Sequence, residues 1–264
     1  MDVAQIRDLF TEQVRRGTAD DGTGSEVTAT PHFVRWAAAG DVGWSEVSWS
    51  NLEESNVDEV IDEQVAYFSS REQSFVWRVF EDDGPSDLGS RLERAGLKFD
   101  GTSQLMVAPV DEVPATVSVP LGVTLSSESD ARGIDRLIEV HERVFGLDHS
   151  QLRRSIRMQL ARVPGSNELV VAMVDGQPVA SSRVQFLPDR QFATLWGGST
   201  LPEWRGKGLY RAMVAHRARS AARRGYSYLS VTASKESRPI LERLSFTPLG
   251  SVSTYAWTPN AASD

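Results

Sequence analysis

The chain has 264 residues, of which 40% are hydrophobic and 24% are charged, a composition typical of soluble globular proteins. Its net charge of −8 argues against a general nucleic-acid-binding protein, which would carry a basic surface. The absence of cysteine excludes disulfides and thiolate ligands, and the four histidines lack HxH or HExxH spacing, so no metal site is predicted. Because there is neither a membrane-length apolar run nor an apolar leader, we expect a cytoplasmic protein without a membrane partner.

The apolar spacing of the first 110 residues predicts alternating helices and strands. In chain order these are a helix over 3–16, neighbouring strands over 32–38 and 44–52, a helix over 57–68, a strand over 75–80, a helix over 85–95 and a strand over 104–110. The segment 18–25 is rich in glycine and aspartate and is expected to be a loop. Asp111–Pro120 contains two prolines and little periodicity, so we interpret it as a linker.

A second set of elements follows the linker. In chain order these are a strand over 123–125, helices over 134–145 and 151–163, strands over 168–174 and 178–186, a strand over 192–200, a helix from about residue 209, a strand over 226–232, a helix over 238–244 and a final pair of strands ending near Trp257. Asp175-Gly176 is a strong hairpin signal between two of the strands. Residues 260–264 are expected to be a frayed tail.

The most informative stretch is Phe192–Gly225, which reads as a strand, a glycine loop and a helix. Arg205-Gly206-Lys207-Gly208 immediately precedes the helical pattern. A helix start in this context directs free backbone N–H groups and the positive end of the helix dipole at one point. We therefore predict a phosphate-binding site at this loop. The pair Gly197-Gly198 inside the preceding strand predicts a bulge or a close approach of backbone.

An internal repeat relates the two sets of elements. LERAGL begins at Leu92 and LERLSF at Leu241, an offset of 149 residues. The same offset places the strand 44–52 on the strand ending at Leu201, and the helix beginning at Val57 on the one beginning near Gly206. Where the second copy has PEWRGKG, the first has EESNVDE. Acidic residues at a helix N-terminus repel phosphate, so the first copy is predicted to keep the scaffold without the site.

Together these motifs resemble the GNAT superfamily of acyl-CoA-dependent N-acetyltransferases, in a tandem arrangement. The family signature is Arg or Gln, two residues, Gly, one residue, then Gly or Ala. Arg205 and Gly208 match it, whereas Tyr210 stands in the last position. The resemblance implies an α/β (α+β) fold of two domains, each with a central mixed, mostly antiparallel sheet flanked by helices. The implied division is a degenerate domain over 1–110, a linker over 111–120 and an acetyltransferase domain over 121–264.

The resemblance further implies that acetyl-CoA binds as the acyl donor. Its pyrophosphate would lie on the backbone amides of residues 205–211, and its pantetheine arm would follow residues 198–200. The implied cofactor-binding residues are Gly198, Ser199, Thr200, Arg205, Gly206, Lys207, Gly208, Leu209, Tyr210, Arg211, Ser234 and Ser237. For Lys207 and Arg211, a role as solvated helix-face cations is an equal alternative.

The catalytic groups are harder to assign. Members of this family commonly use a tyrosine, on the helix after the fifth strand, to protonate the leaving thiolate. Leu241 stands at that position, and Ser234 stands where an asparagine is often found. The strand 192–200 also has no glutamate to act as a base. The remaining candidates for acid–base work are Glu142, His149 and Tyr255. Proton transfer to water and a site without catalysis are the alternatives.

The predicted function is acetyl-CoA-dependent N-acetyltransfer to the amine of a small molecule or an amino terminus, by direct attack in a ternary complex. The alternative is a non-catalytic acyl-CoA-binding or regulatory protein built on the same fold. A homodimer is compatible with the sequence. A nucleotide-phosphate enzyme fits poorly, because RGKGLY lacks the P-loop ending and no dinucleotide GxGxxG motif is present.

Overall fold

The computed structural model describes residues 2–40, 42–115 and 117–259. Thr116 of the predicted linker and the predicted tail Asn260–Asp264 lie outside this range. The described strands are β1 (Glu26–Ala29), β2 (Phe33–Ala37), β3 (Glu46–Ser50), β4 (Phe75–Phe80), β5 (Lys98–Pro109), β6 (Thr124–Glu128), β7 (Asn167–Val174), β8 (Gln177–Phe186), β9 (Phe192–Thr200), β10 (Tyr228–Ala233) and β11 (Thr247–Trp257). The α-helices are α1 (Val3–Phe10), α2 (Val57–Ser69), α3 (Leu88–Arg94), α4 (Ala131–Phe145), α5 (Ser150–Arg162), α6 (Leu209–Arg223) and α7 (Arg238–Glu242).

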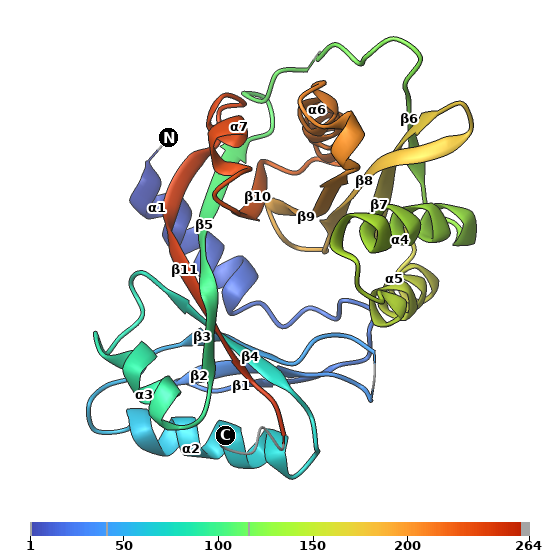
Figure 1. The fold of residues 1–264 in the computed structure, drawn as a ribbon. Helices are drawn as coiled ribbons and strands as arrows, with labels where there is room; N and C mark the ends of the chain where they lie inside the picture. The colour runs from blue at the N-terminus through green and yellow to red at the C-terminus, as the bar shows by residue number, and fades with distance from the viewer. Residues whose placement is uncertain (1, 41, 116, 260–264) are drawn as a thin grey trace.

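These strands form one mixed sheet in the order β1-β2-β3-β4-β11-β5-β10-β9-β8-β7-β6 (Figure 1). Within the described range, its pairs are antiparallel except for β3–β4 and β9–β10. The predicted α/β class, a mixed sheet flanked by helices, is therefore confirmed. The two expected sheets are continuous with each other. We call β1–β5 with α2 and α3 the N-terminal half, and β6–β11 with α4–α7 the C-terminal half.

The last part of the chain differs from the prediction. The expected pair of strands ending near Trp257 is wrong, because Thr247–Trp257 is a single strand of 11 residues. Gly250 has φ +153°, and the register with β5 shifts between Pro248 and Gly250. The glycine and proline thus mark a bulge inside one strand rather than a turn between two. The short edge strand β1 was also not predicted.

Strands β5 and β11 connect the two halves reciprocally. β11 belongs to the C-terminal half by sequence, yet it lies between β4 and β5. In turn β5, which belongs to the N-terminal half by sequence, lies between β11 and β10 of the C-terminal half. Each half therefore inserts one long strand into the sheet of the other (Figure 1). Ser103 pairs with Val252 in the antiparallel β5–β11 ladder. These positions are separated by the same 149 residues as the sequence repeat, so a local two-fold axis passes between them.

The N-terminal helix closes the core at this junction. Ile6 and Phe10 of α1 are buried against Phe192 of β9 and Val252 of β11. After α1, the π-helical turn η1 (Thr11–Arg15) places Arg15 in a buried ion pair with Asp83, 2.6 Å apart and with both side chains 4% exposed. The segment before β1 therefore fastens both halves together.

The two faces of the C-terminal half are covered by different helices. The Ser181 hydroxyl of β8 donates to the Leu137 carbonyl of α4. The next residue, Ser182, contacts the Met213 sulfur of α6. Since successive strand residues face opposite sides of a sheet, α4 covers one face and α6 the other. None of the described helices is long and apolar enough to cross a membrane.

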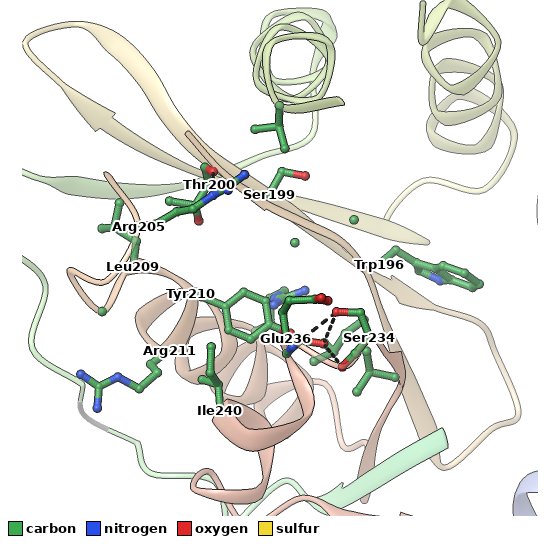
Figure 2. A pocket seen from close by; sticks show the side chains of 18 of the residues that line it. Trp196, Ser199, Thr200, Arg205, Leu209, Tyr210, Arg211, Ser234, Glu236 and Ile240 are labelled. Carbon is green, nitrogen blue, oxygen red and sulfur yellow. Dashed lines mark hydrogen bonds between the residues drawn. The ribbon is translucent and has the colours of Figure 1, made fainter. Parts of the chain in front are cut away.

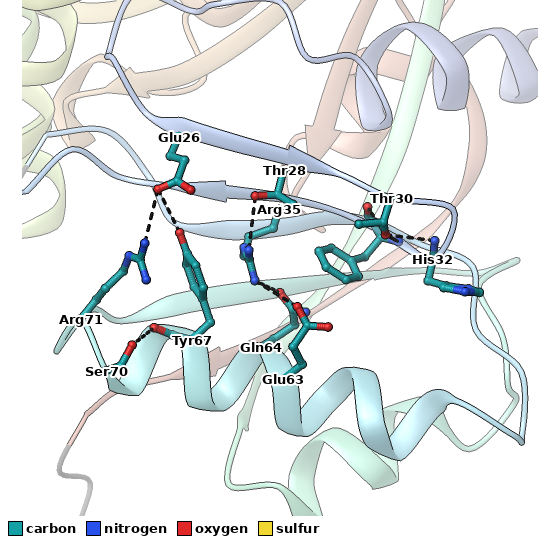
Figure 3. Close-up of polar contacts among 11 residues, drawn as sticks. Glu26, Thr28, Thr30, His32, Arg35, Glu63, Gln64, Tyr67, Ser70 and Arg71 are labelled. Atoms are coloured by element: carbon teal, nitrogen blue, oxygen red, sulfur yellow. Dashed lines mark hydrogen bonds and ion pairs between the residues drawn. The ribbon is translucent and has the colours of Figure 1, made fainter.

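The N-terminal half has diverged in its interior. Figure 3 shows Arg35 of β2 pointing toward α2, where it lies over the Tyr67 ring at 3.4 Å and donates to Gln64 Oε1 at 3.0 Å. The Tyr67 hydroxyl donates to Glu26 at 3.2 Å. The 149-residue offset makes Met213 the counterpart of Gln64. At this pair of equivalent positions the contact of helix with sheet is thus polar in the N-terminal half and apolar in the C-terminal half.

Candidate functional site

A cavity opens where two central strands separate. β9 and β10 pair in parallel only over Phe192–Thr194 and Tyr228–Ser230. Beyond these residues both strands continue without pairing to each other, as far as Thr200 and Ala233. A cavity of about 910 Å³ is lined by β9, by β10 and by the start of α6. Its volume falls within the usual range of ligand pockets.

The wall formed by β9 contains the predicted bulge. The register with β8 shifts opposite Gly197, which has φ +56°. A Cβ atom on Gly197 would lie 2.8 Å from His141 Cε1, so the backbone approaches α4 closely. The His141 Nε2 atom is 2.9 Å from the Gly197 carbonyl oxygen and must carry the proton, since the carbonyl only accepts. Burial lowers the pKa of His141 to about 4, so the ring is neutral at physiological pH.

The loop before α6 exposes backbone donors to the cavity. Gly206 and Gly208 have φ of +73° and +84°, in the left-handed region that favours glycine. The first hydrogen bond of α6 runs from the Ala212 N–H to the Gly208 carbonyl. The N–H groups of residues 209–211 therefore have no partner within the helix. No side chain in the described chain caps α6, and its first turn has no acidic residue. This helix start is suited to an anion.

The equivalent helix start in the N-terminal half is different. The first turn of α2 carries Asp58 and Glu59. Arg91 of α3 pairs with Asp58, at 2.9 Å, and also with Glu54 and Asp87. The Arg91 guanidinium of the protein itself thus pairs with the carboxylates at the start of α2.

The structure brings almost all of the predicted cofactor-binding residues to the one cavity. Figure 2 shows the cavity with many of these side chains. The predicted residues that line it are Gly198, Ser199, Thr200, Arg205, Gly206, Gly208, Leu209, Tyr210, Arg211, Ser234 and Ser237. Lys207 is not among them, and its ammonium lies over the Trp204 ring at 4.3 Å. The Ser199 hydroxyl is buried and has no hydrogen-bond partner in the described residues, which leaves a polar group available at the wall.

The three residues predicted as candidates for acid–base catalysis do not line the cavity. Glu142 and His149 lie at the turn between α4 and α5, where the His149 N–H donates to Glu142 Oε1 at 3.4 Å. They do not line the cavity, although Val144 and Phe145 between them do. Tyr255 pairs with Trp77 of β4 and packs in the core of the N-terminal half. The long strand β11 carries Tyr255 away from the cavity.

Several lining residues were not predicted. The lining residues outside the prediction include Trp196, Phe145, Arg217, Glu236, Ile240 and Arg243. Arg217 is 1% exposed, and its Nε and Nη1 atoms donate to the carbonyls of Met213 and Arg183. No carboxylate in the described residues pairs with it. Burial lowers its pKa to about 10, so it remains charged at neutral pH. Its position two helical turns after Tyr210 is the sequence signal that could have identified it.

The mixed sheet thus opens into a cavity beside a helix start that no side chain of the described residues caps. Residues 134–246 match the model of the acetyltransferase (GNAT) family, so this part of the chain is a GNAT-family domain. No group of His, Asp or Glu side chains in the described residues is arranged to hold a metal ion.

Solved structures share the fold over most of the chain. A GCN5-related N-acetyltransferase from Kribbella flavida is 16% identical with a TM-score of 0.70, covering 98% of this chain and 96% of that one. A GCN5-related N-acetyltransferase from Sphaerobacter thermophilus is 13% identical with a TM-score of 0.61, covering 96% and 85%. A tandem GNAT protein from the clavulanic acid biosynthesis pathway is 12% identical with a TM-score of 0.58, covering 88% and 79%. No curated protein matches the chain.

Proposed function

We propose that the protein is an acetyl-CoA-dependent N-acetyltransferase that acts on the amine of a small molecule or an amino terminus. The observation that carries this proposal is that two structural elements line one cavity. Its lining includes both the uncapped start of α6 and the bulged strand β9. The site would belong to an acetyltransferase domain over 121–264, preceded by a degenerate domain over 1–110 and a linker over 111–120.

The residues present suit such a donor. Backbone N–H groups within residues 205–211 would hold the pyrophosphate, since those of residues 209–211 have no partner within the helix and lie at the positive end of its dipole. Gly198, Ser199 and Thr200 would follow the pantetheine arm, and the unpartnered Ser199 hydroxyl offers it a hydrogen bond. Ser234 and Ser237 lie on the opposite wall. By contrast, the N-terminal half places carboxylates at the equivalent helix start, so we propose no donor site there.

The proposed reaction is direct transfer within a ternary complex. The neutral amine attacks the thioester carbonyl carbon, a C–N bond forms, the C–S bond breaks, and sulfur leaves with the electron pair. The attacking nitrogen loses one proton. We propose that Glu142 and His149 accept this proton through water, because they flank the lining residues Val144 and Phe145.

Two measurements test the proposal. Isothermal titration with acetyl-CoA should show one site per chain, and mass spectrometry should detect acetylated product from at least one member of a broad amine panel. Acetyl-CoA binding without product above the hydrolysis background would favour the non-catalytic alternative. Failure to bind acetyl-CoA at all would refute the site.

A further inference from the structure

The chemistry of the cavity leaves one question, namely which group protonates the departing sulfur. The titratable side chains lining it are Arg205, Tyr210, Arg211, Arg217, Glu236 and Arg243. Arginine does not release a proton at neutral pH. The Ser234 hydroxyl lowers the pKa of Glu236, which is exposed at the rim and ionised. Tyr210 is therefore the neutral proton donor among the described residues that line the cavity.

The ring of Tyr210 reaches the strand where the thioester would lie. A Cβ atom placed on Gly198 would be 2.7 Å from Tyr210 Cε2, 3.3 Å from Cδ2 and 3.8 Å from Cζ, so one edge of the ring lies against β9, one residue beyond the bulge. Ser237, just before α7, also interacts with this side chain and acts to lower the pKa of Tyr210. Figure 2 shows the ring between the strand carrying Ser199 and the loop carrying Ser234.

A buried positive charge on the same helix also lines the cavity. Arg217 faces the same cavity from the same helix, and two of its nitrogen atoms are held by the backbone carbonyls of Met213 and Arg183. Burial raises the pKa of Tyr210, while the Arg217 charge acts in the opposite direction. Because Arg217 has no carboxylate partner in the described residues, its charge is available to stabilise an anion formed beside it.

The position of Leu241 strengthens this assignment. Its side chain is 0% exposed and packs in an apolar cluster with Leu244 and Phe246. It carries no proton, and it is replaced in the cavity wall by Ile240 of the same helix. Helix α7 therefore contributes no side chain that could titrate in the interior of the cavity, in the range that the structure describes.

We propose that Tyr210 protonates the departing thiolate of CoA and that Arg217 stabilises the phenolate left behind. The inference rests on the proposed function. As the C–S bond breaks, sulfur takes the bond's electron pair and then the phenolic proton. The phenolate regains a proton from solvent, and the proton lost by the amine nitrogen passes through water to Glu142 or His149, from which it returns to solvent. One amide and one thiol are formed.

The test is Tyr210→Phe, which keeps the ring against Gly198 and removes the hydroxyl. We expect kcat with acetyl-CoA to fall about 100- to 10,000-fold, the usual contribution of a general acid. The dissociation constant for acetyl-CoA should remain within about threefold, because the backbone phosphate site is untouched. Tyr226→Phe is the matched control. Its hydroxyl donates to the Leu187 carbonyl outside the cavity, and we expect unchanged kcat.

A second donor separates proton transfer from a structural role. An acetyl thioester of an acidic aryl thiol releases a thiolate that needs no proton, so the ratio of wild-type to Tyr210→Phe rates should fall towards one. An equal defect with both donors, or wild-type kcat in Tyr210→Phe, would overturn the inference and leave the proposed function intact. If the wild-type protein acetylates no amine, the proposed function fails and this inference fails with it.

Discussion

Gly208→Glu is the sharpest perturbation of the loop before α6. Gly208 is the N-cap of α6, has φ +84° and lines the cavity. A Cβ atom there would be 3.3 Å from the Nη2 atom of Arg211. The new carboxylate would thus enter the face proposed to hold pyrophosphate, with one cation close enough to pair with it.

The size of the effect follows from these contacts. Two unit charges about 6 Å apart repel by about 2.8 kcal/mol at an effective dielectric constant of about 20. Arg211 is exposed, and a surface ion pair with it would offset at most about 1 kcal/mol. The remaining repulsion of about 1.8 kcal/mol corresponds to a loss of acetyl-CoA affinity of at least about 20-fold. Repulsion of this kind should weaken as salt shortens the Debye length.

Isothermal titration of acetyl-CoA at low and high salt measures both the loss and its screening. Gly208→Ala is the matched control, since it imposes the positive-φ strain, about 1–2 kcal/mol of stability, without a charge. Glu59 occupies the equivalent position in the N-terminal half and is exposed on α2. We expect Glu59→Gln to leave affinity unchanged. Affinity of Gly208→Glu within twofold of wild type at low salt would show that the loop does not bind phosphate.

Three further variants test the walls and the core. Gly198→Ala places a Cβ atom 2.7 Å from Tyr210 Cε2, so the ring must move. We expect a loss of about 1–3 kcal/mol in the free energy of unfolding and a reduced kcat. An unchanged free energy of unfolding and an unchanged kcat would contradict the close packing of Tyr210 against Gly198. Burial holds the pKa of His141 at about 4, so stability should be complete above about pH 6.5 and fall as pH drops from 6.5 to 4, where the unfolded chain binds a proton that the folded chain does not. In urea titrations, the change in the free energy of unfolding between pH 6.5 and 4 should be smaller in His141→Gln than in the wild type, by up to about 3 kcal/mol. The same change in both proteins would contradict a lowered pKa at His141. Asp83→Ala leaves Arg15 buried without its partner and should cost about 3–5 kcal/mol in thermal unfolding, whereas a loss below 1 kcal/mol would count against a buried pair.

Local signals in the sequence were sufficient for most elements and for the loop. Asp175 and Gly176 both have positive φ, as the predicted hairpin requires. The pair Gly197-Gly198 predicted the bulge because a glycine tolerates the left-handed backbone and the contact with His141 that the bulge requires. Information of this kind resides in a few neighbouring residues, and therefore it can be read without knowing the rest of the fold.

The pairing of strands that are far apart in the sequence could not be predicted from such local signals. Nothing near Thr247–Trp257 indicates that this strand leaves its own half to pair with β4, so Tyr255 was considered near the site although it packs in the opposite core. Arg217 was missed for a related reason. An arginine in a helix is usually solvated, and its burial depends on the sheet packed against α6. Such features depend on tertiary contacts that no local pattern encodes.

The reciprocal strands also have a consequence for biosynthesis. A ribosome releases β4 and β5 long before β11, yet β11 is the strand that lies between them. Until β11 emerges, the N-terminal half exposes two unpaired strand edges, of the kind that invite pairing with other chains. Completion of the N-terminal half therefore waits for the synthesis of β11, although domains generally fold one after another during translation. A nascent chain released before Thr247 would lack a central strand in both halves.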